Sequence, residues 1–252
     1  MLTEERLSRI LDLLDTNGSV TVSELMKKLD SSESTIRRDL NYLDREGRLQ
    51  KVRGGAISAG NPTIFTSRDD EVHLRKTRNV AEKNQVAKYA ASLIQPGDFI
   101  YLDAGTTTEC MIDYITERDS TFVTNAVSHA KKLAGLGFTV YILGGEFKNA
   151  TEAIVGEDAI YSLRKYNFSK GFFGTNGITK KEGLTTPELK EAMVKEIAMS
   201  HSREAYVLAD NSKFGQVSSV RFADFQNVTI VTDRVDRPGF QGCQNIVEVS
   251  RL

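Results

Sequence analysis

Apolar residues recur at helical spacing in the first part of the chain and predict two short helices. The first helix has apolar positions in an i, i+3, i+4, i+7 pattern, namely Leu7, Ile10, Leu11 and Leu14. Asn17-Gly18 ends this helix in the way that a left-handed C-terminal cap does. A second helix is predicted after Thr21, which forms a capping box with Glu24. Its inner face consists of Val22, Leu25 and Leu29.

A third helix is predicted after Ser31 or Ser32, because either hydroxyl group suits a helix start. Its apolar stripe consists of Ile36, Leu40 and Leu43. The opposite face is polar and carries Ser34, Arg37, Arg38, Asn41 and Arg45. Arginine and asparagine present the donors and acceptors that match guanine and adenine edges in the major groove of DNA. We therefore expect this helix to end at Gly47 and to recognise DNA.

A small wing is predicted after the third helix. Residues 48–53 alternate between polar and apolar side chains before a turn at Gly54-Gly55, as in a two-stranded wing, and their Lys and Arg side chains suit DNA phosphates. An arginine-rich helix by itself is as consistent with a solvated surface as with DNA binding. Only Asp30 to Ser32 separate the second and third helices, and this helix-turn-helix spacing favours DNA binding. We therefore expect a winged helix-turn-helix domain over residues 1–57.

The remainder of the chain reads as a linker followed by one α/β domain. Residues 58–63 are small and polar and include Pro62, so residues 58–76 are expected to form the linker. Helices are expected at 78–95, 109–116, 126–134, 157–166 and 187–199. Strands are expected at 99–102, 121–123, 139–143, 171–173, 205–209, 228–232 and 245–249. Their alternation predicts βαβ units, and hence a mostly parallel sheet, over residues 77–252.

Polar or glycine-rich segments follow several of the expected strands. They lie at 103–108, 124–125, 144–146, 174–177 and 210–215. Ligands of parallel sheets bind beyond the carboxyl ends of the strands, so these segments are expected to form one pocket. Gly105 to Thr108 can aim backbone N–H groups and hydroxyls at an anion, although for this loop in isolation threonines that only cap the helix are the better interpretation. Lys213 can add a point charge for the same anion or can be a surface lysine.

The N-terminal motif resembles the DNA-binding signature of the DeoR family of bacterial transcriptional regulators. The resemblance rests on Thr35-Ile36-Arg37-Arg38-Asp39-Leu40, Gly47 and Arg53-Gly54-Gly55-Ala56. The residues expected to contact DNA are Ser32, Ser34, Thr35, Arg37, Arg38, Asn41, Arg45, Lys51 and Arg53.

The later part of the chain is similar to the effector domain of the same family, whose fold resembles that of ribose-phosphate isomerases. The resemblance rests on 103–108, 124–125, 144–145 and 210–215, and it implies that a phosphorylated sugar binds there and relieves or strengthens operator binding. The residues expected to bind it are Asp103, Gly105, Thr106, Thr107, Thr108, Thr124, Asn125, Gly144, Gly145, Asn176 and Lys213. Residues 170–177 resemble regulators of fructose operons, which implies fructose 1-phosphate; tagatose 6-phosphate, glycerol 3-phosphate and a deoxyribose phosphate stay open.

The alternative is a sugar-phosphate isomerase-like enzyme that carries a DNA-binding domain. The resemblance places the catalytic carboxylate of such isomerases in the segment 174–177, where this chain has Asn176. An amide cannot take a proton from carbon at neutral pH, so no catalytic residue is expected. Four carboxylates remain near the expected pocket: Asp103, Glu146, Glu188 and Asp210.

The composition limits the class of protein further. The net charge is only −1, so DNA binding has to rest on local charge, as in residues 37–53 with six positive and three negative side chains. Two distant cysteines and three isolated histidines predict neither a disulfide framework nor a metal site, and no cofactor is expected. Neither a targeting segment nor an apolar run of ~18 residues is present, which predicts a cytoplasmic protein. The expected partners are double-stranded operator DNA, a sugar phosphate and further copies in a homodimer or homotetramer.

Overall fold

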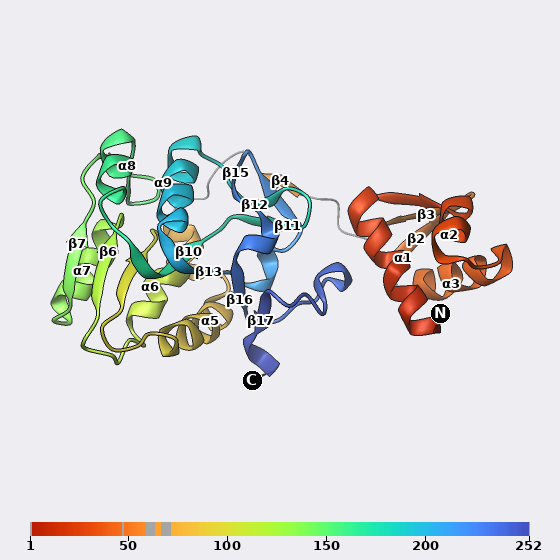
Figure 1. Cartoon of the computed structure of the whole chain (residues 1–252), viewed down its shortest axis with the longest axis horizontal. Coiled ribbons are helices and arrows are strands. Elements are labelled where there is room, and N and C mark those ends of the chain that lie inside the picture. Colours follow the sequence, from red (N-terminus) through yellow and green to blue (C-terminus); the bar gives the residue numbers. More distant parts are fainter. Residues whose placement is uncertain (1, 47, 59–63, 67–71, 252) are drawn as a thin grey trace. The chain divides into compact units, whose positions relative to one another are not determined.

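The computed structural model describes residues 2–46, 48–58, 64–66 and 72–251. The chain divides into two compact units, one of Met1–Ile64 with Asp236–Gln241 and the other of Phe65–Val235 with Gly242–Leu252. The expected helix end at Gly47 and much of the expected linker, at 59–63 and 67–71, lie outside the described residues. Figure 1 shows the helices and strands of both units.

The N-terminal unit contains the three predicted helices. They are α1 (Thr3–Asn17), α2 (Val22–Leu29) and α3 (Glu33–Arg45). The predicted ends are confirmed: Gly18 is left-handed at φ 72°, Thr21 and Glu24 form the capping box, and the Ser32 hydroxyl accepts from the Thr35 N–H. The apolar stripes of the three helices, including Ile10, Leu25 and Leu40, meet in one core. The caps and apolar stripes in the local sequence therefore account for the fold of this unit.

The wing has one more strand than the sequence pattern predicts. Its strands are β1 (Ser19–Thr21), β2 (Leu49–Val52) and β3 (Gly55–Ser58), and they pair antiparallel in the order β1-β3-β2. Strand β1 is too short to show an alternating pattern, so its presence depends on pairing with β3. Gly55 is required at this pairing, because a Cβ atom there would overlap the Val20 carbonyl oxygen.

The C-terminal unit is built on a seven-stranded sheet in which every pair of neighbours is parallel. The strand order is β17-β16-β13-β10-β5-β6-β7. The strands span Phe99–Leu102 (β5), Thr121–Thr124 (β6), Thr139–Ile142 (β7), Phe168–Gly174 (β10), Ser202–Leu208 (β13), Thr229–Thr232 (β16) and Ile246–Glu248 (β17). This confirms the predicted α/β class with a parallel sheet.

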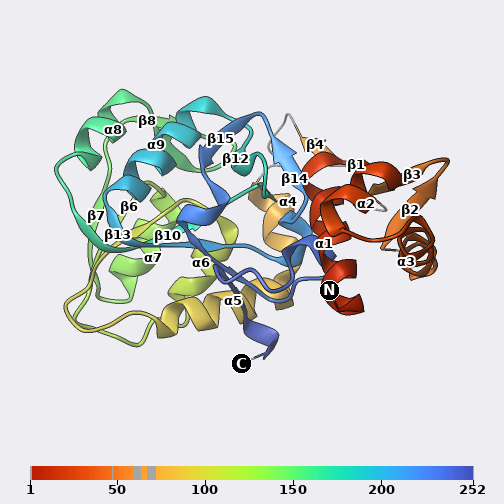
Figure 2. The same cartoon turned by 45° about the vertical axis from the view of Figure 1, so that its right-hand side comes forward.

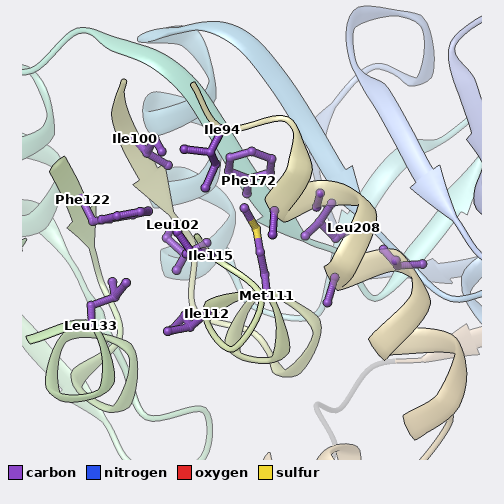
Figure 3. Packing of buried hydrophobic residues seen from close by; sticks show 14 of the residues in the cluster. Ile94, Ile100, Leu102, Met111, Ile112, Ile115, Phe122, Leu133, Phe172 and Leu208 are labelled. Atoms are coloured by element: carbon purple, nitrogen blue, oxygen red, sulfur yellow. The ribbon is translucent and has the colours of Figure 1, made fainter. Parts of the chain in front are cut away.

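Helices cover both faces of this sheet. They are α5 (Val80–Ser92), α6 (Thr106–Ile112), α7 (Val127–Gly135), α8 (Glu157–Leu163) and α9 (Leu189–Ser200). Helices α5, α6 and α7 lie along one face, and α8 and α9 lie along the other (Figures 1 and 2). Figure 3 shows the core under the first face, where Met111 and Ile112 of α6 and Leu133 of α7 pack against Phe122 and Phe172 of the sheet.

Several short elements were not predicted. The region expected to be only a linker contains β4 (Ile64–Thr66), which pairs with β14 (Gln216–Ser218), and α4 (Val72–Thr77). Two further small sheets are formed by β8 (Glu146–Lys148) with β9 (Ala153–Val155), and by β11 (Gly177–Thr179), β12 (Gly183–Thr186) and β15 (Val220–Ala223). Short 3-10 helices lie at Asn211–Lys213, Phe225–Asn227, Pro238–Phe240 and Val249–Arg251. Helix α6 also begins three residues earlier than expected, so Thr106 to Thr108 form its first turn.

Candidate DNA-binding face and anion pocket

The polar face of α3 is exposed along its length. Ile36, Leu40 and Leu43 are fully buried on the inner side of the helix. The exposed residues among those expected to contact DNA are Ser32, Ser34, Arg37, Arg38, Asn41, Arg45, Lys51 and Arg53, whereas Thr35 is half-buried. The fold thus brings the residues of the helix and of the wing strand into one basic segment of the N-terminal unit. Their contact with DNA stays a prediction.

Hydrogen bonds orient some of these side chains. The Lys51 backbone N–H donates to Asp44 at 2.8 Å, and Lys51 Nζ donates to Asn41 Oδ1 at 2.5 Å, so β2 is attached to α3. Arg37 Nη2 lies 2.6 Å from Glu33 Oε1 one turn earlier. In the part of the chain that the structure describes, Arg38 is exposed and forms no ion pair, so the two arginines differ in their surroundings.

A pocket of the C-terminal unit lies at the carboxyl edge of its sheet. Its walls come from the α4–α5 junction, the first turn of α6, the end of β10, α9 and the segment after β13. The residues that line it are Arg75, Arg78, Asn79, Lys83, Ala104, Gly105, Thr106, Thr107, Thr151, Gly174, Thr175, Asn176, Glu191, Lys195, Leu208, Ala209, Asp210, Ser212 and Lys213. Three of the five expected segments, 103–108, 174–177 and 210–215, therefore meet as predicted.

A buried polar network lies along and behind the inner wall of the pocket. Asp103, after β5, forms an ion pair with Lys195 of α9, and its carboxylate also accepts the Gly174 N–H at 3.0 Å. Burial raises the pKa of the Asp103 carboxyl, and the Lys195 ammonium works against that rise. Burial would also raise the pKa of Glu191, but Lys195, Thr151 and Lys148 together lower it. These carboxylates are thus used to hold lysines in place.

Further basic side chains line the pocket. Arg75, Arg78, Lys83 and Lys213 all line it. Lys83 is buried, which lowers the pKa of its ammonium group, while the nearby Asp210 opposes this shift and Lys213 reinforces it. An anion between these groups would reduce their mutual repulsion and favour the charged form of Lys83. The pocket is therefore suited to an anionic ligand with hydroxyl groups, which Thr106, Thr107 and Asn176 can bind.

Several residues that were expected to bind this ligand lie outside the pocket lining. Thr108 Oγ1 donates to the Asp103 carbonyl at 2.7 Å, and Thr124 Oγ1 donates to the Leu102 carbonyl at 2.6 Å. Asn125 is buried and accepts the Ala104 N–H at 2.8 Å, so it shapes the pocket wall from behind. The remaining residues outside the lining are Asp103, Gly144 and Gly145. At Gly145, φ is 143° and a Cβ atom would press against the Val155 carbonyl oxygen, which accounts for the glycine without a ligand.

The sequence pattern did not identify some of the residues that line the pocket. They are Arg75, Arg78, Asn79, Lys83, Glu191 and Lys195. Glu191 and Lys195 could have been found from the sequence. They have i, i+4 spacing and share a face of α9 with the small residues Ala192 and Ala198. Charged residues on such a buried face indicate a polar site. Arg75 lies in the expected linker, and Lys83 lies near the start of the next helix. Nothing in the local pattern of either region indicates a pocket.

The two sites define the class of protein: a DNA-binding regulator whose second domain carries a ligand pocket. Residues 6–61 match the family described as the DeoR-like helix-turn-helix domain, and residues 78–234 match the family described as the DeoR C terminal sensor domain. The chain belongs to the DeoR family of transcriptional regulators.

Named relatives support this assignment over nearly the whole chain. The chain is 40% identical over 245 residues to FruR of Bacillus subtilis (strain 168), named as an uncharacterized HTH-type transcriptional regulator, with 97% of this chain and 96% of that protein covered. It is 37% identical over 250 residues to the lactose phosphotransferase system repressor of Staphylococcus epidermidis, with 97% and 98% covered. The corresponding Staphylococcus aureus repressor is 36% identical over 253 residues, with 99% of each chain covered. The relatives are regulators, and this chain is a regulator and not an enzyme.

Solved structures of ribose 5-phosphate isomerases resemble part of the chain. The isomerase A of Methanocaldococcus jannaschii has a TM-score of 0.41 and 18% identity, covering 54% of this chain and 55% of that chain. The isomerase of Plasmodium falciparum has a TM-score of 0.39 and 18% identity, covering 52% of each chain. The match spans about half the length of each isomerase.

Two further features of the described residues concern ligands and membranes. Within the described ranges, no group of three or more His, Cys, Asp or Glu side chains is arranged to hold a metal ion. None of the helices found there is both long enough and apolar enough to span a membrane.

Proposed function

We propose that the chain represses a sugar catabolic operon in the cytoplasm and is controlled by a phosphorylated sugar such as fructose 1-phosphate. The winged helix-turn-helix residues of α3 and β2 bind operator DNA, and the sugar phosphate binds in the pocket of the C-terminal unit. One observation carries the proposal: a pocket lined by Arg75, Arg78, Lys83, Lys195 and Lys213 belongs to the same chain as a recognition helix with exposed arginines.

The chemistry of the pocket favours a phosphorylated sugar over an uncharged one. Arg75, Lys83 and Lys213 supply positive charge for a phosphate, while Thr106 and Asn176 supply groups that hydrogen-bond to hydroxyls. The names of the relatives point to the same class of ligand, since they include a FruR and repressors of lactose phosphotransferase systems. Tagatose 6-phosphate, glycerol 3-phosphate and a deoxyribose phosphate are the alternative ligands.

The proposed operator complex contains at least two copies of the chain. A single winged helix reads few base pairs, and a repressor gains affinity by placing two recognition helices on repeated half-sites. We propose a homodimer or homotetramer for this reason. Full operator affinity of a monomeric protein on one half-site would contradict this part of the proposal.

A ligand panel tests the proposal directly. Thermal unfolding of the full chain is measured with fructose 1-phosphate, tagatose 6-phosphate, glycerol 3-phosphate and deoxyribose 5-phosphate, and with fructose and inorganic phosphate as controls. A ligand at 100 times its Kd stabilises the protein by about 2.7 kcal/mol. The panel member that stabilises it is then added to an operator-binding assay, which shows whether DNA is released or held. Equal curves with all six compounds would contradict the proposed ligand class.

A further inference from the structure

Helix α4 (Val72–Thr77) is part of the pocket wall although it directly follows, along the chain, the segment that leads from the N-terminal unit. Arg75 of α4 lines the pocket, and its backbone carbonyl accepts a hydrogen bond from the buried Lys83 ammonium, which lines the pocket as well. The chain therefore passes from the DNA-binding residues into the pocket wall with no other helix between them in the described residues.

Contacts at both ends of α4, together with the Lys83 bond to its Arg75 carbonyl, hold the helix in this place. Lys76 Nζ lies 3.0 Å from Glu109 Oε2 of α6, and the Val72 N–H donates to the Ala150 carbonyl at 3.2 Å. Val72 is buried, but Leu74 is half exposed at 51%. A helix of six residues is unstable without such contacts, because nucleation is unfavourable and few hydrogen bonds follow it. Helix α4 therefore stays in place only while these tertiary contacts hold it.

Asn79 lies between α4 and α5, and hydrogen bonds to residues that line the pocket hold its backbone conformation. Asn79 is left-handed at φ 51°, which is rare for a residue with a side chain. Its Nδ2 donates to Asp210 Oδ1 at 2.8 Å and to Ser212 Oγ at 3.2 Å. Both partners lie just before Lys213 in the chain, and all three residues line the pocket. Beyond Asn79, α5 is fixed to the sheet by buried residues such as Val86 and Ala90.

We propose that α4 is a strap that the sugar phosphate closes over the pocket, and that its closing is the signal passed along the chain toward the DNA-binding residues. The inference rests on the proposed function. A phosphate held by Lys213 and Thr106 on the fixed walls gains the Arg75 contact only when the strap is closed. Because a ligand shifts an equilibrium by its difference in affinity for the two states, this contact biases the strap toward the closed position.

Hydrogen–deuterium exchange of the full chain tests the strap. The probe is whichever of fructose 1-phosphate and tagatose 6-phosphate stabilises the protein in thermal unfolding. We expect the amides of residues 72–79 to exchange at least threefold more slowly with this ligand. A ligand that stabilises the protein but leaves exchange in 72–79 unchanged would overturn the strap and leave the proposed function in place. If neither compound nor any other sugar phosphate of the panel stabilises the protein, the proposed function and the strap both fail.

A pair of matched variants separates a strap from a passive wall. Lys76→Gln breaks the α4–α6 ion pair, and Lys132→Gln breaks a comparable surface pair, in which Lys132 lies 2.7 Å from Asp113 after α6. Neither residue lines the pocket. With the strap less often closed, Lys76→Gln should weaken the apparent affinity for the probe about threefold and speed exchange in 72–79 without ligand. The control should change neither quantity, and equal behaviour of the two variants would refute the strap.

Discussion

Arg6 of α1 forms a bidentate ion pair with Asp39 of α3. Arg6 Nε lies 2.5 Å from Asp39 Oδ2, and Arg6 Nη2 lies 3.1 Å from Asp39 Oδ1. The side chains are only 11% and 5% exposed. Asp39 therefore holds the proposed recognition helix on α1 from its inner side. This accounts for the acidic residue directly after Arg37 and Arg38.

The Asp39→Ala variant should be strongly destabilised. It leaves the Arg6 guanidinium buried without its carboxylate, and removing one partner of a buried pair typically costs about 3–5 kcal/mol. The matched control is Glu33→Ala in the same helix, which breaks the exposed pair with Arg37 and should cost at most about 0.5 kcal/mol. Urea unfolding of both variants measures the difference. Equal losses of stability would show that the Arg6–Asp39 pair does not hold α3.

Arg37→Ala and Arg38→Ala should differ in their effects on operator binding. Arg38, which forms no ion pair within the described residues, should read a base edge, so its loss should cost about 1–3 kcal/mol and relax one operator position. Arg37 shares its guanidinium with Glu33, so its loss should weaken all sequences alike and lower the salt slope by about 1. Binding to a set of single-base operator variants at two salt concentrations distinguishes the two residues. Unchanged binding in both variants would remove α3 as the recognition helix.

The sequence predicts the N-terminal unit well because its signals are local. Caps such as Thr21 and Gly18 act within one turn, and each helix has an apolar stripe of its own. Asp39 lies in such a stripe, at i+3 from Ile36, and this position alone indicates that it is buried. Strand β1 has no comparable signal, since it exists only through pairing with β3 some 35 residues later.

The pocket is less predictable for the same reason. The polar segments at the strand ends follow from the α/β pattern, and Gly105, Thr106, Thr107, Asn176 and Lys213 do line the pocket. Its remaining charges come from helices whose side chains reach it only after the chain has folded, as with Arg75 of α4. A local pattern predicts where a pocket lies but not which distant helices close it.

Stability should fall below neutral pH in a way that depends on His129. This residue is fully buried, and burial lowers its pKa from 6.5 to about 3, with Lys132 and Lys76 acting in the same direction and the Gly105 carbonyl opposing them. The folded state then binds fewer protons than the unfolded state between about pH 6.5 and pH 3. Its contribution to the free energy of unfolding is present above pH 6.5 and is lost at about 1.4 kcal/mol per pH unit below it.

The His129→Gln variant isolates this contribution. Glutamine cannot be protonated in this range, so the slope of unfolding free energy against pH should be smaller in the variant than in the wild type, whatever its stability at pH 7. Urea unfolding at pH 7, 6 and 5 gives both slopes, and other titrating groups cancel in the difference. Parallel slopes would show that folding does not lower the pKa of His129.

Lys213→Ala and Thr107→Asp should both lose control by the sugar phosphate while keeping operator affinity. The first removes a positive charge from the pocket, and the second places a carboxylate beside Lys83 and Lys213, where it repels an anion. Neither residue belongs to the DNA-binding segment, so operator affinity without ligand should stay within about twofold. We expect ligand affinity to fall at least about tenfold, which corresponds to about 1.4 kcal/mol.

The control for these variants is Lys88→Ala, an exposed lysine of α5 outside the pocket, which should respond like the wild type. The comparison also tests coupling between the sites, which is typically ~1–3 kcal/mol and reciprocal. Operator DNA should change the affinity of the wild type for the ligand by the same factor by which the ligand changes operator affinity. Because both pocket variants act on ligand binding and not on DNA binding, titration with ligand in an operator-binding assay separates them from variants of α3. A wild-type response from both would place the phosphate site elsewhere in the chain.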